Sequence, residues 1–364
     1  MNAVPQPLPA AGERLPAPAL AGLIADALGV CGLPSDDAAS VAELMVEADL
    51  TGADGHGIFR LAQYVRRLRG GGVNPRPAIT AQRLAPALAR VDGDNGMGHL
   101  VMRRATEIAV DIATEAGLGW VGVRRSNHAG PASLYVDSLA RRGFIGIYSV
   151  VASANHMAPW GGTSLLLGTN PLAIAIPGGA GAPPVLLDIA TTVVSYGTVK
   201  KHVLNGTPMP EGWMVSKIDG TPVTDPARSG EGVLLPIGGH KGSGLALMLG
   251  LLAGTLNGAA FGSEVVDFNA DSSTETNTGH FILALDVGRF MPLEVFAATM
   301  ARQLDELRHD APLPGTDGVR IPGDRRAVLR AARLREGVPL PAPLRRQLDD
   351  LAATLGIAPL AARF

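Results

Sequence analysis

Helix-like patterns at both ends of the chain, with strand-like patterns between them, limit the fold more than any single motif does. Apolar residues recur at helical spacing up to about residue 118 and again after residue 293. Between these stretches, Gly, Pro and Asn separate short apolar segments that we predict as strands, among them WVGVRRS, FIGIYSVVAS, PLAIAIPGG, PVLLDIAT and HFILALDV. Strand and helix do not alternate regularly, so a doubly wound parallel sheet is not supported. We expect an α/β fold with a mixed, non-Rossmann sheet.

The same patterns predict two domains, which suits a chain of 364 residues. A Pro-rich arm covers residues 1–15. A helical domain covers residues 16–118 and is completed by residues 300–364, so that it is discontinuous. The mixed-sheet domain covers residues 119–299.

Composition argues against a nucleic-acid partner, disulfides within the chain and a signal peptide. The net charge is −2, and no Lys/Arg-rich stripe with interleaved aromatic residues occurs, so we expect no nucleic-acid partner. Cys31 is the only cysteine, which excludes disulfides within the chain and fits a cytoplasmic location. The N-terminal segment lacks the basic start and apolar run of a signal peptide.

Residues 242–261 carry no charge and approach the length of a membrane span. Asn257 interrupts this stretch, glycine is frequent in it, and no second such segment exists. We therefore expect a buried helix packed through its glycine face, and no membrane partner.

A G-x-G-x-x-G pattern occurs as GLGWVG, from Gly117 to Gly122. The dinucleotide-binding motif needs a strand before the glycines and a helix after them, and here we expect the reverse order. The segment GDNGMGH near Gly96 does run from strand to helix but lacks the third glycine and the spacing. Neither segment predicts a Rossmann site.

The stretch DGHGIFR places His56 between two glycines and Arg60 four residues later. If a helix starts near Gly57, the two side chains share one face about a turn apart. A proton donor beside a fixed cation suits a small carboxylate substrate. The alternative is a glycine-rich turn between two helices.

Three further segments place basic side chains where a helix begins. In RSNHAGPAS, His128 lies between a strand and a helix that we expect to start near Pro131. In GGHKGSG, His240 and Lys241 stand at the start of a long helix, whose free N–H groups favour anions, although the order of residues is not that of a phosphate-binding Walker loop. The GDRR segment could hold a phosphate or form an ordinary solvated helix start.

Two classes of chemistry find no support. The eight histidines are dispersed, without a carboxylate or second histidine at ligand spacing, so we expect no metal site. No G-x-S-x-G elbow occurs, so an acyl-transfer hydrolase has no nucleophile.

Taken together, these segments resemble the malate/L-lactate dehydrogenase family, which is distinct from the Rossmann-type lactate dehydrogenases. The blocks that carry the resemblance span nearly the whole chain after the arm and include DGHGIFRLAQYVRRLRGGGVNPRP, DGDNGMGH, SNHAGPA, APWGGTSLLLGTNPLAIAIP, DIATT, PEGW, GGHKGSGLALML and GHFILALD. The resemblance implies a helical discontinuous domain, a mixed-sheet domain that binds NADH or NADPH, and a homodimer.

The resemblance also implies roles for single residues. Arg60 would bind the substrate carboxylate, and Thr169 would contact the substrate. In the hydroxy-acid members the histidine matching His128 is assigned as the acid/base, whereas in the imino-acid reductases the residue matching His56 has that role. The cofactor-binding residues implied are His128, Ala129, Gly130, Pro131, Ala132, Ser153, Asp188, Ile189, Ala190, His240, Lys241, Arg320, Ile321, Pro322, Gly323, Asp324, Arg325 and Arg326.

Two positions depart from the family pattern. Gly55 stands where relatives usually have a serine, and Thr198 stands where the imino-acid reductases have an aspartate that works with that serine. Both relay partners of His56 are therefore missing, which moves weight toward His128 as the acid/base.

We expect an NAD(P)H-dependent oxidoreductase that transfers hydride to C2 of a small 2-oxo or cyclic 2-imino carboxylate, like the Δ1-piperideine-2-carboxylate and Δ1-pyrroline-2-carboxylate reductases. One alternative is an NAD-dependent 2-hydroxy-acid dehydrogenase of malate, lactate or ureidoglycolate type. Another is a homologue that binds the nucleotide without turnover. Two adjacent arginines, Arg325 and Arg326, suit the 2′-phosphate of NADP(H), which we favour over NAD(H), although the pyrophosphate of either cofactor would suit them as well.

Overall fold

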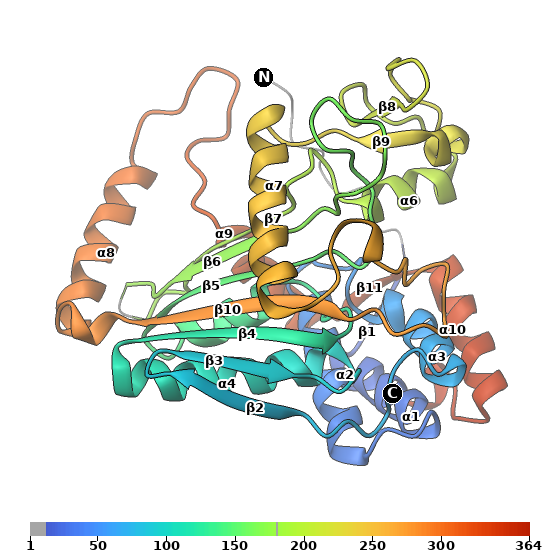
Figure 1. The fold of residues 1–364 in the computed structure, drawn as a ribbon, viewed down its shortest axis with the longest axis horizontal. Helices are drawn as coiled ribbons and strands as arrows, with labels where there is room; N and C mark the ends of the chain where they lie inside the picture. The colour runs from blue at the N-terminus through green and yellow to red at the C-terminus, as the bar shows by residue number, and fades with distance from the viewer. Residues whose placement is uncertain (1–11, 180) are drawn as a thin grey trace. The chain divides into compact units, whose positions relative to one another are not determined.

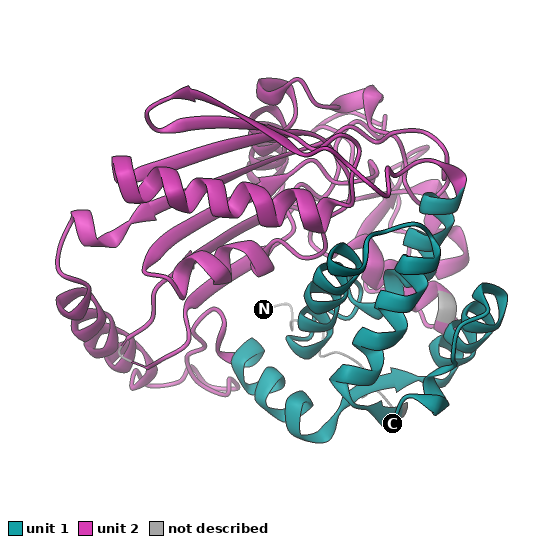
Figure 2. Cartoon of the chain, turned by 90° about the horizontal axis from the view of Figure 1, so that it is seen from below, with its two compact units in different colours: residues 1–69, 325–364 teal, residues 70–324 magenta. Residues whose placement is uncertain are grey.

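The computed structural model describes residues 12–179 and 181–364, which divide into two compact units. Unit 1 consists of the residues up to Arg69 together with Arg325–Phe364, and unit 2 consists of Gly70–Asp324 (Figure 2). Unit 1 is thus built from two separate stretches of the chain, which confirms the expected discontinuous helical domain. The expected α/β class with a mixed, non-Rossmann sheet is confirmed as well.

Unit 1 is mainly helical. Its short ladder pairs β1 (Gly12–Leu15) with β11 (Val338–Pro341) in antiparallel register. The expected arm therefore ends in a strand, while its residues 1–11 lie outside the described residues. The helices of this unit, two of which run one residue past its bounds, are α1 (Ala17–Val30), α2 (Ser35–Leu50), η1 (Ile58–Arg60), α3 (Leu61–Gly70), α9 (Asp324–Glu336), α10 (Ala342–Leu355) and η6 (Leu360–Ala362).

Unit 2 is organised around a seven-stranded sheet with the order β2-β3-β4-β10-β5-β6-β7 (Figure 1). The pair β3–β4 is parallel and the other neighbours are antiparallel, so the sheet is mixed. Its strands are β2 (Thr80–Ala85), β3 (Leu88–Asp92), β4 (Leu118–Ser126), β5 (Phe144–Val150), β6 (Leu172–Ile176), β7 (Val185–Ile189) and β10 (Thr278–Asp286).

Helices cover both faces of this sheet: α4 (Gly98–Ala116) and α5 (Ser133–Ala140) lie on one face, and α7 (His240–Ala253) lies on the other (Figures 1 and 2). Two glycines of β4 allow the helical layers to pack closely against the sheet, because they have no side chain. A Cβ on Gly119 would lie 2.3 Å from the carbonyl oxygen of Ala109 in α4, and one on Gly122 would lie 1.9 Å from Oδ1 of Asn257. Because side chains alternate along a strand, these positions face opposite helical layers.

Apart from α8, the remaining elements of unit 2 are short. Residues of α6 and the β8–β9 ladder pack into a separate apolar cluster that includes Val199, Met209 and Trp213. The elements are α6 (Tyr196–Asn205), β8 (Met214–Ser216), η2 (Pro226–Glu231), β9 (Gly232–Leu234), η3 (Thr255–Asn257), η4 (Gly262–Glu264), η5 (Val287–Arg289) and α8 (Leu293–Arg308).

The units differ from the domain bounds expected from sequence, because tertiary pairing decides where a segment belongs. β2 and β3 join the sheet, and α4 packs on it, so residues 80–116 lie in unit 2. Residues 300–324, which we expected to complete the helical domain, also lie in unit 2.

The uncharged stretch of residues 242–261 does not form one continuous helix. α7 ends at Ala253, and the buried amide of Asn257 donates to the carbonyl oxygens of Ala253 and His280. Within the described residues, no helix is long and apolar enough to cross a membrane.

Candidate active site

The predicted pair His56 and Arg60 lies in unit 1, on a loop of tight turns between α2 and α3. The backbone N–H of Arg60 donates to the carbonyl oxygen of Gly57 at 2.9 Å, and its Nε donates to the carbonyl oxygen of Gly55 at 2.8 Å. The helical turn starts at Ile58 with Gly57 as its N-cap, as expected. His56 precedes the N-cap, however, so it does not share a helical face with Arg60. Instead, the Arg60 side chain folds back over the segment that carries His56.

Arg60 lies in a partly apolar environment. Its guanidinium lies 5.6 Å from the centre of the Phe59 ring, and burial lowers the pKa of Arg60. Burial also raises the pKa of the neighbouring Tyr64 far above its usual value, so that phenol stays neutral. Arginine remains a cation in such surroundings. A cation removed from bulk water attracts a carboxylate more strongly than an exposed one does.

The basic residues at the start of α9 also belong to unit 1. Arg325 opens its second stretch, and the guanidinium of Arg326 donates to Oγ1 of Thr51 at 3.1 Å. One turn later, Arg330 pairs with Glu47 at 2.7 Å. Arg326 and Arg330 of α9 therefore contact the C-terminal end of α2. The sequence motif GDRR did not predict this packing.

In unit 2, His128 follows the end of β4 and is held on two sides. Its Nδ1 accepts the backbone N–H of Gly130 at 3.3 Å. Its ring stacks on Phe268, with 5.1 Å between ring centres and 5° between ring planes. The backbone N–H of Phe268 in turn donates to the carbonyl oxygen of Ser153 at 3.0 Å.

The segment that carries His128 packs against the glycine-rich loop GDNGMGH. The buried amide of Asn127 donates to the carbonyl oxygens of Asn95 and Gly96, both at 3.0 Å, and its Oδ1 accepts the hydroxyl of Thr276 at 3.1 Å. A Cβ on Gly98 would lie 2.1 Å from the backbone oxygen of Asn127. The glycine therefore lets α4 begin directly against the His128 segment.

Backbone strain gathers at the same place. Among the described residues, four that are not glycine have positive φ, and they are Asp94, Asn95, Arg125 and Asn277, with φ between 42° and 56°. They contact one another: the N–H of Asn95 donates to Arg125 O, the N–H of Arg125 donates to Asn277 Oδ1, and the Arg125 guanidinium pairs with Asp94 at 3.2 Å. Left-handed residues of this kind cost free energy and concentrate at functional sites.

Hydrogen bonds join the predicted cofactor segments around β7. Oδ2 of Asp188 accepts the N–H of Ser133 at the start of α5, which links the segment 188–190 to the segment 128–132. The N–H of Leu186 donates to the carbonyl oxygen of Pro322, which links β7 to the segment 320–324.

Thr169 and the start of α7 join the same group of segments. The carbonyl oxygen of Thr169 accepts both the N–H and the hydroxyl of Thr191 at 2.9 Å. The carbonyl oxygen of Thr191 accepts the N–H of Ile237, just before His240 and Lys241. Within unit 2, the structure therefore brings together predicted segments that lie far apart in the chain.

The N-terminus of α7 suits an anion. Gly238 and Gly239 both have positive φ, at 59° and 64°, and Gly239 caps the helix without a side-chain hydrogen bond. His240 and Lys241 are exposed at the first positions of the helix. Free N–H groups, the helix dipole and a lysine ammonium favour a phosphate here.

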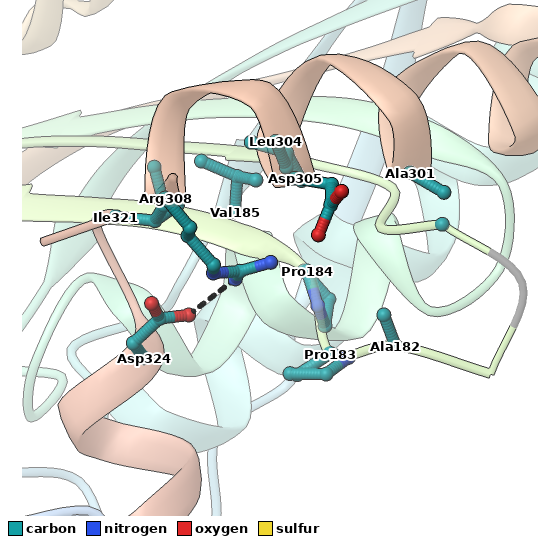
Figure 3. Close-up of a pocket in the computed structure, with 11 residues that line it drawn as sticks. Ala182, Pro183, Pro184, Val185, Ala301, Leu304, Asp305, Arg308, Ile321 and Asp324 are labelled. Carbon is teal, nitrogen blue, oxygen red and sulfur yellow. Dashed lines mark hydrogen bonds and ion pairs between the residues drawn. The ribbon is translucent and has the colours of Figure 1, made fainter. Parts of the chain in front are cut away.

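A small pocket of about 140 Å³ lies beside the segment 320–324 (Figure 3). Val185, Leu304 and Ile321 supply apolar wall, and Arg308 pairs with Asp324 at 2.9 Å at its side. Sequence motifs gave no sign of Arg308, which comes from α8. No group of three or more His, Cys, Asp and Glu side chains within the described residues is arranged to hold a metal ion.

A comparison with known protein families identifies the family of this chain. The model of the family described as malate/L-lactate dehydrogenase matches residues 15–349. The chain belongs to the malate/L-lactate dehydrogenase family. It is accordingly an NAD(P)-dependent oxidoreductase, as the resemblance of its motifs predicted.

Relatives in this family carry several activities in their names. A malate dehydrogenase of Pyrococcus abyssi is 36% identical over 94% of this chain and 95% of its own. A ureidoglycolate dehydrogenase (NAD(+)) of Escherichia coli is 34% identical over 87% and 89%. A (2R)-3-sulfolactate dehydrogenase (NADP(+)) of Chromohalobacter salexigens is 35% identical over 90% and 93%. Both cofactors thus occur among the relatives.

The solved structures include a Δ1-piperideine-2-carboxylate reductase of Pseudomonas syringae pvar. tomato. It superposes with a TM-score of 0.82 at 29% identity, covering 93% of this chain and 100% of that one. The fold is therefore shared between members named for hydroxy acids and a member named for an imino acid.

In this member of the malate/L-lactate dehydrogenase family, the structure shows the surroundings of the two positions that depart from the family pattern, Gly55 and Thr198. A Cβ on Gly55 would meet nothing within 4 Å, so the position has room for a side chain. Thr198 lies in the first turn of α6, where its hydroxyl and that of Ser195 are 3.0 Å apart and its N–H donates to Ser195 Oγ. Thr198 thus takes part in capping a helix.

The sequence did not predict one cluster of polar and aromatic side chains near His128. Nζ of Lys200 donates to Oδ1 of Asn269 at 2.9 Å and lies 5.6 Å from the centre of the Tyr196 ring. The ring of His156 stacks on the same Tyr196 ring, with 3.7 Å between ring centres. Asn269 follows Phe268, the residue on which His128 stacks. Lys200 is therefore a half-buried cation held on the same turn that holds the histidine, and no local motif marks it.

Proposed function

We propose that this chain interconverts a small 2-oxo carboxylate and the corresponding 2-hydroxy acid, with His128 as the acid/base. The observation that carries the proposal is the strained backbone around the His128 segment, together with the two contacts that fix its ring. Backbone strain of this kind persists only where many surrounding contacts hold the residues in place, and it is typical of functional sites.

The proposed chemistry divides simply among the residues. When bound, the nicotinamide cofactor supplies or accepts a hydride at the substrate C2. During reduction the imidazolium form of His128 gives a proton to the carbonyl oxygen and becomes neutral, and during oxidation the neutral ring takes the hydroxyl proton. Arg60 binds the C1 carboxylate and so fixes the orientation of C2. Thr169 contacts the substrate.

Lys200 supports a narrower substrate class, in which a second acidic group follows the 2-oxo group. A half-buried ammonium on the turn that holds His128 suits a second carboxylate or a sulfonate. Relatives named malate and sulfolactate dehydrogenases act on acids of this kind.

The residues of unit 2 fit a phosphate-bearing nicotinamide cofactor. Lys241 and the free N–H groups of α7 would hold phosphate, and the segments 128–132, 188–190 and 320–324 would bind the remainder. We propose NADP(H) over NAD(H), supported by the adjacent cations Arg325 and Arg326. Titration of both cofactors against wild type and Arg325→Ala tests this, because a loss confined to NADPH is expected.

Reduction of a cyclic 2-imino carboxylate through His56 is the second candidate. The likeness to the piperideine-carboxylate reductase favours it. The missing serine at Gly55 and the missing aspartate at Thr198 weigh against it.

An absorbance screen at the nicotinamide band tests the proposal. It compares pyruvate, the 2-oxo counterparts of malate and sulfolactate, and cyclic imines, each with NADH and NADPH. We expect fastest turnover of a 2-oxo acid with a second acidic group. Faster reduction of cyclic imines would favour the second candidate, and tight cofactor binding without any turnover would indicate a homologue that has lost catalysis.

We further propose a homodimer in the cytoplasm. The single, partly buried Cys31 supports a reducing compartment. Exposed apolar side chains on and before α8, including Phe290, Leu293 and Val295, support a second copy of the chain as partner. Sedimentation equilibrium of wild type and Val295→Glu tests the dimer.

A further inference from the structure

A buried carboxyl lies directly beneath the loop that carries His56 and Arg60. Asp49, the penultimate residue of α2, is only 2% exposed. Its Oδ2 accepts the backbone N–H of Ile58 at 2.8 Å, at the start of the helical turn that contains Arg60. A carboxyl placed at the beginning of a helical turn satisfies an N–H that would otherwise have no partner within the helix.

The carboxyl also occupies space that any side chain at Gly57 would need. A Cβ on Gly57 would lie 1.9 Å from Oδ1 and 2.1 Å from Cγ of Asp49. The φ of Gly57 is −87° and its ψ is −140°, and a side chain at this position would collide with the Asp49 carboxyl. Asp49 and Gly57 therefore interlock.

The other end of the loop is held from α9. Arg333, which is 9% exposed, contacts the backbone oxygen of Asp49 and the carboxylate of Asp54. The loop between these two attachments consists of Gly55 and His56, and the carbonyl oxygen of Gly55 accepts the Nε of Arg60. Movement of residues 57–58 would therefore displace both His56 and Arg60.

We propose that Asp49 is a positioning residue for the reaction, whose carboxyl oxygen holds the backbone at Gly57–Ile58 and thereby sets the positions of Arg60 and His56. This inference rests on the proposed role of Arg60 in binding the substrate carboxylate. It assigns Asp49 no contact with substrate or cofactor.

The hydrogen-bond acceptor matters more than a negative charge at this position. The pKa of Asp49 is raised to about 8, mainly by burial and also by the charge of Asp54, while the Ile58 N–H and Arg333 act in the opposite direction. The neutral acid and an asparagine amide have nearly the same shape and both present a carbonyl oxygen. Asn should therefore replace Asp49 well, whereas Ala should not.

The test compares Asp49→Asn, Asp49→Ala and Gly57→Ala, with Gly55→Ala as the matched control because a Cβ there meets nothing within 4 Å. Asp49→Ala and Gly57→Ala should each raise the KM for the oxo-acid substrate at least about 10-fold, since small misplacements of binding groups are costly. Asp49→Asn and Gly55→Ala should stay within about 3-fold of wild type. The Kd of the cofactor, measured by fluorescence, should be unchanged in all four.

A double variant sharpens the test. Asp49→Ala removes the carboxyl that a Cβ on Gly57 would strike, so Gly57→Ala should do less damage in the Asp49→Ala background than in wild type. Additive losses would contradict the interlock. If Asp49→Ala lowered only the melting temperature and left KM and kcat unchanged, Asp49 would be merely structural and the inference would fail.

Two further measurements separate this inference from the proposed function. If Arg60→Ala left KM unchanged, the proposed role of Arg60 would be wrong, and the inference that depends on it would fall too. If Arg60→Ala raised KM and Asp49→Ala did not, only the positioning inference would fail. Amide hydrogen exchange of residues 51–60 reports how firmly the loop is held, independently of kinetics. The exchange should speed up in Asp49→Ala and not in Asp49→Asn.

Discussion

Gly98 and Asn127 approach each other so closely that a Cβ on Gly98 would lie 2.1 Å from the backbone oxygen of Asn127. The same Cβ would lie 2.6 Å from the backbone oxygen of His128. The start of α4 is thus the surface against which the His128 segment is formed, and the fold of unit 2 determines where the imidazole lies.

Gly98→Ala should therefore damage both stability and catalysis. Overpacking against two carbonyl oxygens costs about 1–3 kcal/mol of the free energy of unfolding, and displacement of His128 should lower kcat by about 100-fold. Urea denaturation and steady-state kinetics measure the two effects. Gly29→Ala in α1, where a Cβ meets nothing, is the control and should be neutral or stabilising. Equal behaviour of the two variants would contradict the account.

Lys200→Met should weaken the binding of oxo acids that carry a second acidic group, because it removes the cation proposed to bind that group. For these substrates, KM should rise by at least about 10-fold. For pyruvate, KM should hardly change. Lys201→Met, at the exposed neighbouring position, is the matched control. A similar effect on both kinds of substrate would show that Lys200 acts on the fold and not on specificity.

Asp49→Asn should alter the pH dependence of stability. Burial raises the pKa of Asp49 from an ordinary value of 3.8 to about 8 in the folded protein, with Asp54 acting in the same direction and Arg333 and the Ile58 N–H in the opposite one. Its contribution to stability is complete below about pH 4 and is lost as the pH rises toward 8. Relative to wild type, the variant should therefore gain at least about 1.4 kcal/mol between pH 5 and pH 8, the equivalent of one pKa unit. Urea titrations at both pH values measure the change, and a constant difference would refute the raised pKa.

Gly55→Ser combined with Thr198→Asp should increase the reduction of cyclic imines relative to that of 2-oxo acids. The serine fits, since a Cβ on Gly55 meets nothing within 4 Å, and an aspartate in the first turn of α6 is favoured by the helix dipole. Together they restore the partners of His56 that the family resemblance implies. The ratio of the two kcat/KM values is the measurement, and Gly55→Ala with Thr198→Ala is the control. No change in the ratio would exclude His56 from this relay.

Buried, regularly patterned segments were predictable from sequence. Each run of apolar residues predicted as a strand corresponds to one of β4, β5, β6, β7 and β10, because one or both faces of these strands are buried. The pattern predicts no strand over Thr80–Ala85, where β2 lies at the sheet edge with five exposed residues. A glycine-rich turn at His56 was one of the two sequence interpretations, but its hydrogen bonds to Asp49 and Arg60 are not visible in the local sequence.

Site residues divide in a similar way. Glycine-rich turns before helices, such as those at His128 and His240, carry a local signal, and the structure brings their segments together within unit 2. Asp49 and Lys200 carry no such signal, because their partners Gly57 and Asn269 are set by tertiary packing. An acidic residue in an amphipathic helix gives no indication that it will lie beneath a loop.

The identity of the acid/base is the central claim, and one comparison tests it most directly. The kcat for reduction of the best 2-oxo acid is measured for His128→Gln and His56→Gln at saturating substrate and cofactor. The account predicts that His128→Gln loses at least about 100-fold in kcat while His56→Gln loses less than about 10-fold. A large loss in His56→Gln with near-normal kcat in His128→Gln would contradict it.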